Sequence, residues 1–215
     1  MISAGGSGNP ERDCPLCPRL AAFRRDQRKI NPGWFNAPVP SFGDIGARLL
    51  IVGLAPGLQG ANRTGRPFTG DYAGDLLYAT LKKFGFARGD YAERADDGLE
   101  LIDCRITNAV RCVPPQNKPE PAEIKSCGGF LVSEIASMPK LRAILALGLI
   151  AHNAALTALQ QRKAAFPFHH GALHAIETKP LLADSYHCSR YNTNTGRLTE
   201  TMFEAVFVEL KKRLG

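Results

Sequence analysis

The chain has 215 residues, of which 44% are hydrophobic, and this length suits one domain with a single sizeable core better than two domains. No stretch approaches the roughly 18 to 20 apolar residues of a membrane span, and residues 1–6 lack the basic and apolar regions of a secretory signal. We therefore expect a soluble, cytoplasmic protein without a membrane partner. The formal net charge of +7 favours a polyanionic partner such as nucleic acid but does not require one.

The first part of the chain has the composition of an arm. Residues 1–46 mix glycine, proline and charged residues, with a short helix predicted over about 19–28. We expect this N-terminal arm to wrap around a single α/β domain at residues 47–215. The arm also carries the closely spaced pair Cys14 and Cys17.

The rest of the chain alternates between strand and helix patterns. Short apolar runs, typical of strands buried on both faces of a sheet, occupy residues 48–53, 101–108, 143–147 and 181–186. Helical patterns cover about 72–84, 119–135, 149–160 and 202–210. This alternation predicts a three-layer α/β/α sandwich around a central, mainly parallel four-stranded sheet.

Polar residues follow the predicted strands at the edge where ligands gather in open sheets. The loop after the first strand runs from Gly53 to Asp71, the second strand ends at Asn108, and the fourth is followed by His187. Because the carboxyl ends of parallel strands meet at one edge, we expect Asp71, Asn108 and His187 to converge there. The sequence therefore predicts a site at this edge.

Each of these residues also has a purely structural interpretation. Asp71 suits the N-cap of the helix that follows it, Asn108 a turn, and His187 a hydrogen-bonded position in the core. Phe68 is more often a core residue than a stacking platform. The glycine-rich loop matches neither a P-loop nor a dinucleotide fingerprint.

Four cysteines have a pattern that favours a metal or iron-sulfur site. Cys14 and Cys17 form a CxxC pair, Cys112 follows the second strand, and Cys127 lies on the inward stripe of a predicted helix. Zinc ribbons usually bring two close pairs, so the spacing favours an iron-sulfur cluster, with zinc and ordinary buried thiols as alternatives. Cys188 directly follows His187, and neighbours in an extended segment point to opposite sides, which argues against a Cys-His nucleophilic pair.

Four ordered motifs carry a family resemblance: Gly-Leu-Ala-Pro-Gly at 53–57, Gly-Arg-Pro-Phe-Thr-Gly-Asp at 65–71, Asn-Ala-Val-Arg-Cys-Val-Pro-Pro-Gln-Asn-Lys-Pro at 108–119, and Ser-Tyr-His-Cys-Ser-Arg-Tyr-Asn at 185–192. Together with the four cysteines they resemble the iron-sulfur uracil-DNA glycosylases, specifically family 5, or type B. The neighbouring family 4 has glutamate where this chain has Leu54 and proline where it has Cys188. Both departures favour family 5.

The resemblance implies a monofunctional base-excision repair enzyme that hydrolyses the bond between uracil and deoxyribose in DNA and leaves an abasic site. It also implies activity on other deaminated bases, hypoxanthine and xanthine among them. A structural four-iron four-sulfur cluster would be bound by Cys14, Cys17, Cys112 and Cys127, and the enzyme is expected to act as a monomer. The alternatives are a noncatalytic iron-sulfur or zinc DNA-binding module and a hydrolase of free nucleosides.

The same resemblance implies a role for each residue of the site. Asp71, His187 and Asn108 would be catalytic, with Asp71 stabilising the sugar cation and the attacking water, and His187 donating toward the base. The base would be held by Gly53, Ala55, Phe68, Asn108 and His187. The DNA would be contacted by Arg63, Arg66, Ser189, Arg190, Tyr191 and Asn192.

Overall fold

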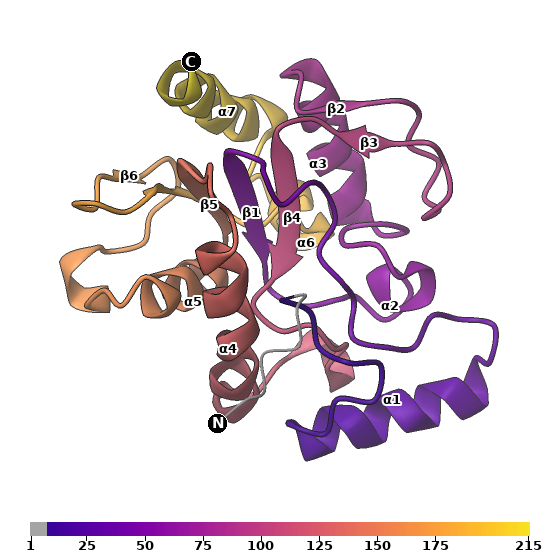
Figure 1. Cartoon of the computed structure of the whole chain (residues 1–215). Helices are drawn as coiled ribbons and strands as arrows, with labels where there is room; N and C mark the ends of the chain where they lie inside the picture. The colour runs from indigo at the N-terminus through magenta and orange to yellow at the C-terminus, as the bar shows by residue number, and fades with distance from the viewer. Residues whose placement is uncertain (1–7) are drawn as a thin grey trace.

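The computed structural model describes residues 8–215, and these residues form a three-layer α/β/α sandwich (Figure 1). The central sheet has the strand order β4-β1-β5-β7-β6. Its strands are β1 (Leu49–Gly53), β4 (Cys104–Asn108), β5 (Ala143–Leu147), β6 (Leu173–His174) and β7 (Leu181–Ser185). The first four in this order pair in parallel, which confirms the predicted parallel sheet. A fifth strand, β6, adds an antiparallel edge that the sequence did not predict.

Helices cover both faces of the sheet. The α-helices are α1 (Pro18–Ile30), α2 (Ala61–Thr64), α3 (Tyr72–Lys83), α4 (Pro121–Ala136), α5 (Leu149–Ala158), α6 (Arg190–Asn194) and α7 (Glu200–Leu214). Two single-turn 3₁₀ helices, η1 (Pro115–Asn117) and η2 (Lys163–Ala165), and a small antiparallel pair, β2 (Ala87–Arg88) with β3 (Glu100–Leu101), complete the elements. None of the helices within residues 8–215 is both long and apolar enough to cross a membrane.

Successive side chains of β1 point to opposite faces of the sheet and so belong to two hydrophobic cores, one on each face. Leu49 and Ile51 face α3 and α7, whose contributions include Leu77 and Phe207. Leu50 and Val52 face the opposite layer, where α4 and α5 pack. Every residue of β1 is buried, because a central parallel strand has a helix layer on each face.

The N-terminal arm packs at the end of the sheet to which β1 and β4 point, where α1 lies in Figure 1. Phe42 forms an isolated antiparallel bridge with Ile106, and the Val39 N–H donates to the Arg111 carbonyl at 2.7 Å. Leu20 of α1 packs against Val110, in the segment that follows β4. The arm is thus attached beside the carboxyl edge of the sheet. A boundary at residues 46 and 47 stays a prediction.

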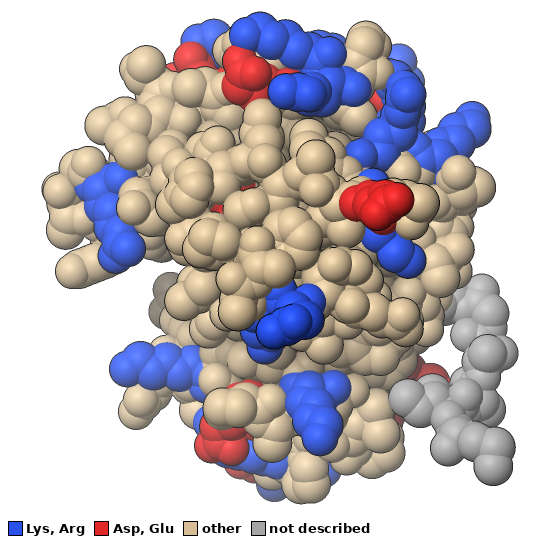
Figure 2. All heavy atoms as spheres, turned by 90° about the vertical axis from the view of Figure 1, so that its left-hand side faces the viewer, with Lys and Arg blue, Asp and Glu red and all other residues tan. Residues whose placement is uncertain are grey.

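The surface charge is dispersed on the face that Figure 2 shows. There, lysine and arginine side chains are most numerous along the upper edge of the view, and the others lie in separate groups across a mainly uncharged surface. The net charge of +7 therefore does not by itself mark a binding surface on this face. A binding surface has to be located from the side chains at the carboxyl edge of the sheet instead.

Candidate active site

The main cleft of the protein lies at the carboxyl edge of the parallel strands. It has a volume of about 870 Å³ and receives residues from the segments that follow β1, β4, β5 and β7. It brings together seven of the residues predicted from the sequence, namely Ala55, Phe68, Asp71, Asn108, His187, Ser189 and Arg190. The expected convergence of Asp71, Asn108 and His187 is therefore present in the structure.

Asp71 uses its two carboxylate oxygens in different ways. Oδ1 accepts the Gly74 N–H at 3.2 Å and so caps the N-terminus of α3. Oδ2 lies against Gly60, where a Cβ atom would be only 2.4 Å from it. Burial raises the pKa of Asp71 above its usual value, although the backbone hydrogen bond to Gly74 opposes this. Asp71 therefore caps α3 and also lines the cleft, so the two interpretations do not exclude each other.

Phe68 and Asn108 meet over the end of β1. A Cβ atom on Gly53 would lie 2.4 Å from Oδ1 of Asn108 and 2.6 Å from Cζ of Phe68. Only a residue without a side chain therefore fits beneath them. Phe68 has a φ of 52°, in the left-handed region that bulky residues seldom adopt. Its ring is buried but forms part of the cleft wall.

His187 lies two residues after β7, and its ring is next to the Phe68 ring in the lining of the cleft. The two rings stack with their centroids 5.9 Å apart and an interplanar angle of 28°. The side-chain amide of Asn192 donates to the His187 carbonyl at 2.8 Å and fixes the backbone there. Burial lowers the pKa of His187 to about 4, so the imidazole is neutral near pH 7.

The segment after His187 forms the mouth of the cleft. The Ser189 hydroxyl caps α6 by accepting the Asn192 N–H, and the guanidinium of Arg190 lies over the Tyr72 ring at 5.4 Å. Tyr191 is 72% exposed. The segment thus presents an aromatic ring and a cation at the surface beside the cleft.

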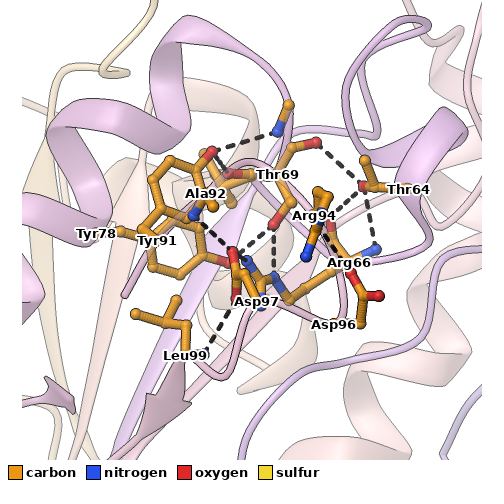
Figure 3. A network of polar contacts seen from close by, with 12 residues as sticks. Thr64, Arg66, Thr69, Tyr78, Tyr91, Ala92, Arg94, Asp96, Asp97 and Leu99 are labelled. Atoms are coloured by element: carbon orange, nitrogen blue, oxygen red, sulfur yellow. Dashed lines mark hydrogen bonds and ion pairs between the residues drawn. The ribbon is translucent and has the colours of Figure 1, made fainter. Parts of the chain in front are cut away.

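Arg66 corrects one of the sequence predictions. It is only 4% exposed, and its guanidinium makes two hydrogen bonds of 2.7 Å to the carboxylate of Asp97 (Figure 3). The same guanidinium lies over the rings of Phe42, Tyr78 and Tyr91 at 5.2 to 5.8 Å. The prediction that Arg66 contacts DNA is wrong, because these partners bury its charge inside the protein.

Arg63 is exposed but lies outside the main cleft. Its Nε donates to the Gln59 carbonyl at 2.8 Å, and its side chain borders a second, shallower hollow beside Asp75 and Tyr91. The structure therefore leaves Arg63 accessible near the cleft without placing it in the lining.

The four predicted metal ligands line one small internal space. Cys14, Cys17, Cys112 and Cys127 surround it together with apolar residues and Arg24. Nη1 of Arg24 points at Sγ of Cys112 at 3.1 Å, and the Arg111 N–H donates to Sγ of Cys127 at 3.3 Å. Burial raises the pKa of Cys112 to about 11 and that of Cys127 to about 12. A cation in this space would therefore have to displace their protons.

The spread of the sulfur atoms bears on what the space can hold. Among the described residues, no three cysteine sulfurs lie mutually within 4.8 Å. One tetrahedral zinc ion, with Zn–S bonds of about 2.3 Å, needs its sulfurs at most about 4 Å apart. The thiolates of an iron-sulfur cluster bind different iron atoms and are spread more widely. Four thiolates are the donor set of an iron-sulfur cluster and of a structural zinc site alike.

Cys104 and Cys188 do not belong to this group. Both are fully buried, and Sγ of Cys188 points at the Ala73 carbonyl at 3.4 Å. Cys188 therefore packs beneath α3 and does not face the His187 ring in the cleft. This placement agrees with the expectation that Cys188 and His187 do not form a nucleophilic pair.

Sequence reasoning missed a second polar cluster. Nδ1 of His152 lies 2.8 Å from Asp184, whose other oxygen lies 3.0 Å from Nε2 of His174. Nε2 of His152 is 2.9 Å from the Phe166 carbonyl. These groups satisfy one another by hydrogen bonding between α5, β6 and β7. No motif signalled them, because they are distant in sequence.

Exposed apolar residues at the rim of the cleft were also missed. Leu149 is 54% exposed and Ile150 is 36% exposed, and both line the cleft at the start of α5. The strand-end rule that selected Asn108 and His187 would have found them, because they follow β5 in the same way.

Comparison with known proteins shows that the chain is similar to members of one superfamily. The model of the "Uracil DNA glycosylase superfamily" matches residues 40–211. A "Type-5 uracil-DNA glycosylase" of Thermus thermophilus is 46% identical over 208 residues, which cover 94% of each chain. One from Mycobacterium tuberculosis is 42% identical over 211 residues, 94% of this chain and 78% of the relative. A "Type-4 uracil-DNA glycosylase" of Pyrobaculum aerophilum is 35% identical over 152 residues, 70% of this chain and 63% of the relative.

Proposed function

This chain belongs to the uracil DNA glycosylase superfamily, and we propose that it is a base-excision repair enzyme of the type-5 kind. It hydrolyses the N-glycosidic bond of uracil in DNA and leaves an abasic site. The observation that carries this proposal is the meeting of Asp71, Asn108, His187 and Phe68 in one cleft at the carboxyl edge of the sheet. A DNA-binding module would need cationic groups for phosphates but none of this constellation.

The cleft suits a nucleotide that has left the DNA helix. The glycosidic carbon is inaccessible inside stacked DNA, so the nucleotide must be flipped into a pocket. Phe68 offers an aromatic face against which the base can stack, opposite the His187 ring. The side chain of Asn108 lies beside Phe68 at the floor, where its amide can hydrogen-bond to the edge of the base.

Asp71 and His187 divide the chemistry between the two sides of the breaking bond. As the bond lengthens, positive charge develops on the sugar, and the Asp71 carboxylate stabilises it and orients the attacking water. The departing base carries negative charge, and the neutral His187 imidazole donates a hydrogen bond to its oxygen. A neutral donor is consistent with the lowered pKa of His187.

The segment 189–192 is proposed to contact the DNA. Tyr191 is exposed enough to enter the gap that the flipped nucleotide leaves, and Arg190 and Arg63 can reach phosphates on either side of it. Ser189 and Asn192 support this segment by capping α6 and tying it to His187. We expect the enzyme to act as a monomer.

We further propose that the enzyme accepts deaminated bases other than uracil. Leu54 and Ala55 line the cleft with apolar atoms where a polar side chain would select one base by hydrogen bonding. The pocket volume of about 870 Å³ also leaves room for the larger purines hypoxanthine and xanthine.

Cys14, Cys17, Cys112 and Cys127 are proposed to bind a four-iron four-sulfur cluster. The four cysteines line one space, N–H donors are directed at the sulfurs of Cys112 and Cys127, and the sequence spacing favours a cluster over zinc. The cluster would supply structural cross-linking between the arm and the segment after β4. Ala55 packs against this cysteine cluster and also lines the cleft, so the two sites share a wall.

A panel of duplexes, each with one uracil, hypoxanthine or xanthine, tests the proposal. After incubation with the enzyme, hot alkali should break the strand at each abasic site, most clearly for uracil. Activity on free nucleosides but not on duplexes would favour the nucleoside hydrolase. No strand break with any of the bases, despite binding of the duplex, would favour the noncatalytic DNA-binding module.

A further inference from the structure

Tyr91 lies outside the main cleft, but its hydroxyl contacts the loop that leads to the catalytic aspartate. The hydroxyl oxygen accepts the Gly70 N–H at 3.2 Å and donates to the Phe68 carbonyl at 3.3 Å. A hydroxyl group can make both bonds at once. Tyr91 therefore holds the backbone on both sides of Thr69, immediately before Asp71.

This stretch of backbone needs to be held. Phe68 has a φ of 52° and Gly70 a φ of 83°, so two left-handed residues lie within three positions. A bulky residue in this region persists only when its surroundings fix it. The first turn of α3 leaves the space that the hydroxyl needs, because a Cβ atom on Gly74 would be 2.5 Å from it.

Tyr91 is itself fixed by the buried ion pair of Figure 3. Its ring packs on the ring of Tyr78 with centroids 4.7 Å apart, and the guanidinium of Arg66 lies 5.8 Å from its centroid. Asp97 holds that guanidinium and also accepts the N–H groups of Ala92 and Leu99 at 2.9 and 3.1 Å. The segment from Tyr91 to Asp97 is thus bound at both ends to the loop before Asp71. Tyr91 binds the backbone around Thr69, and Asp97 binds Arg66.

We propose that Tyr91 is a positioning residue for base excision, which acts by holding the ring of Phe68 where the flipped base stacks. The inference rests on the proposed function. It assigns a role to a residue between α3 and β4 that does not line the main cleft. The Tyr91 hydroxyl is protonated at neutral pH, as for any tyrosine, and can donate to the Phe68 carbonyl; burial raises its pKa further, to about 12.

The variant Tyr91→Phe tests this directly, because it keeps the ring against Tyr78 and Arg66 and removes only the two hydrogen bonds. We expect the maximal single-turnover rate on a uracil-containing duplex to fall about 10- to 100-fold, the scale of a small misplacement of a reacting group. The dissociation constant for the duplex and the shape of the pH profile should stay unchanged. Tyr186→Phe, at a tyrosine that packs against Arg197, is the matched control and should keep the wild-type rate.

A double-mutant cycle with Phe68→Leu separates positioning from a general effect on stability. If Tyr91 acts through the Phe68 ring, Tyr91→Phe should slow the reaction less when that ring is absent. Equal fold-losses in both backgrounds would overturn the proposal, and so would a wild-type rate in folded Tyr91→Phe. Either result leaves the proposed function intact as long as the wild type releases uracil. A wild type that releases none overturns both.

Discussion

Asp71 shows how one side chain serves the fold and the site together. Its Oδ1 caps α3 through the Gly74 N–H, and its Oδ2 remains in the cleft beside Gly60. The cap fixes the carboxylate in place, so the group that would face the sugar cation does not need to be ordered during the reaction. Burial raises the pKa of Asp71, because the carboxylate anion is less well hydrated there. A positive charge that develops nearby therefore stabilises the anion more strongly than it would in water.

The pKa shifts of Asp71 and His187 predict the pH profile of base release. Asp71 must be ionised to act, so the single-turnover rate should fall as pH drops through its raised pKa. His187 has a pKa of about 4 and is already neutral above it, so its titration should add no limb near the ordinary histidine value of about 6.5. Rates measured from about pH 5 to pH 9 check this, with circular dichroism at each pH as the control for folding. A rate that declines as pH rises through about 6.5 would instead show that a protonated His187 is required.

Arg66 illustrates what residue types alone cannot determine. An arginine in a glycine-rich loop near a DNA site is equally consistent with phosphate binding and with a structural ion pair. The partner, Asp97, is 31 residues away and comes from a segment with no strong pattern of its own. Only the folded chain brings the two together, and so the sequence led to the wrong role.

At the scale of elements, the parallel strands place the site. Asn108 is the last residue of β4, His187 lies two residues after the end of β7, and Asp71 comes at the end of the loop after β1. Backbone pairing continues past the strands, since the Ala109 N–H donates to the Gly53 carbonyl at 2.9 Å. This contact keeps Asn108 beside Gly53 and Phe68, so the floor of the cleft is an extension of the sheet.

The lack of a side chain at Gly53 predicts a local and specific defect. Gly53→Ala would force a methyl group against Asn108 and Phe68, and we expect the single-turnover rate of uracil release to fall about 10- to 100-fold. Gly33→Ala is the matched control, because a Cβ atom there meets nothing within 4 Å. Thermal unfolding should show that both variants fold. A wild-type rate in Gly53→Ala would mean that Asn108 and Phe68 can move without loss of function.

Much of the fold and of the site could be predicted because strong local patterns mark them. The four central strands are continuous apolar runs, and Asp71, Asn108 and His187 follow from the rule that strand ends carry the chemistry. The edge strand β6 has only two residues and leaves no such pattern. Tyr91 could not be predicted either, since its role depends on how residues 84–103 fold back on the loop before Asp71.

At the scale of the whole molecule, the cysteine cluster connects distant parts of the chain. Two of its cysteines come from the arm, one follows β4 and one comes from α4, and the space between them adjoins Leu20 and Val110. Arg24 adds a further link, from Cys112 to the carbonyl of Cys14. A bound group would add to these contacts and to the Phe42–Ile106 bridge in holding the arm.

Removing one ligand therefore tests the scaffold. Cys112→Ser should lose the absorbance near about 400 nm expected of a thiolate-bound iron-sulfur cluster. Its melting temperature should fall, and DNA binding should be lost together with activity. Cys104→Ala removes a buried thiol outside the cluster and should keep the absorbance band. Purified wild type that contains zinc, or a Cys112→Ser variant that keeps its colour and stability, would contradict the assignment.

The variant Asp71→Asn tests whether the cleft of Asp71, Asn108 and His187 breaks the base-sugar bond. The amide oxygen of asparagine can still accept the Gly74 N–H, so the variant should keep the cap and lose only the charge. In single-turnover release of uracil from a duplex, we expect the variant to be at least about 100-fold slower than the wild type, with an unchanged melting temperature. A folded Asp71→Asn protein that releases uracil at the wild-type rate would show that the Asp71 charge takes no part in base release.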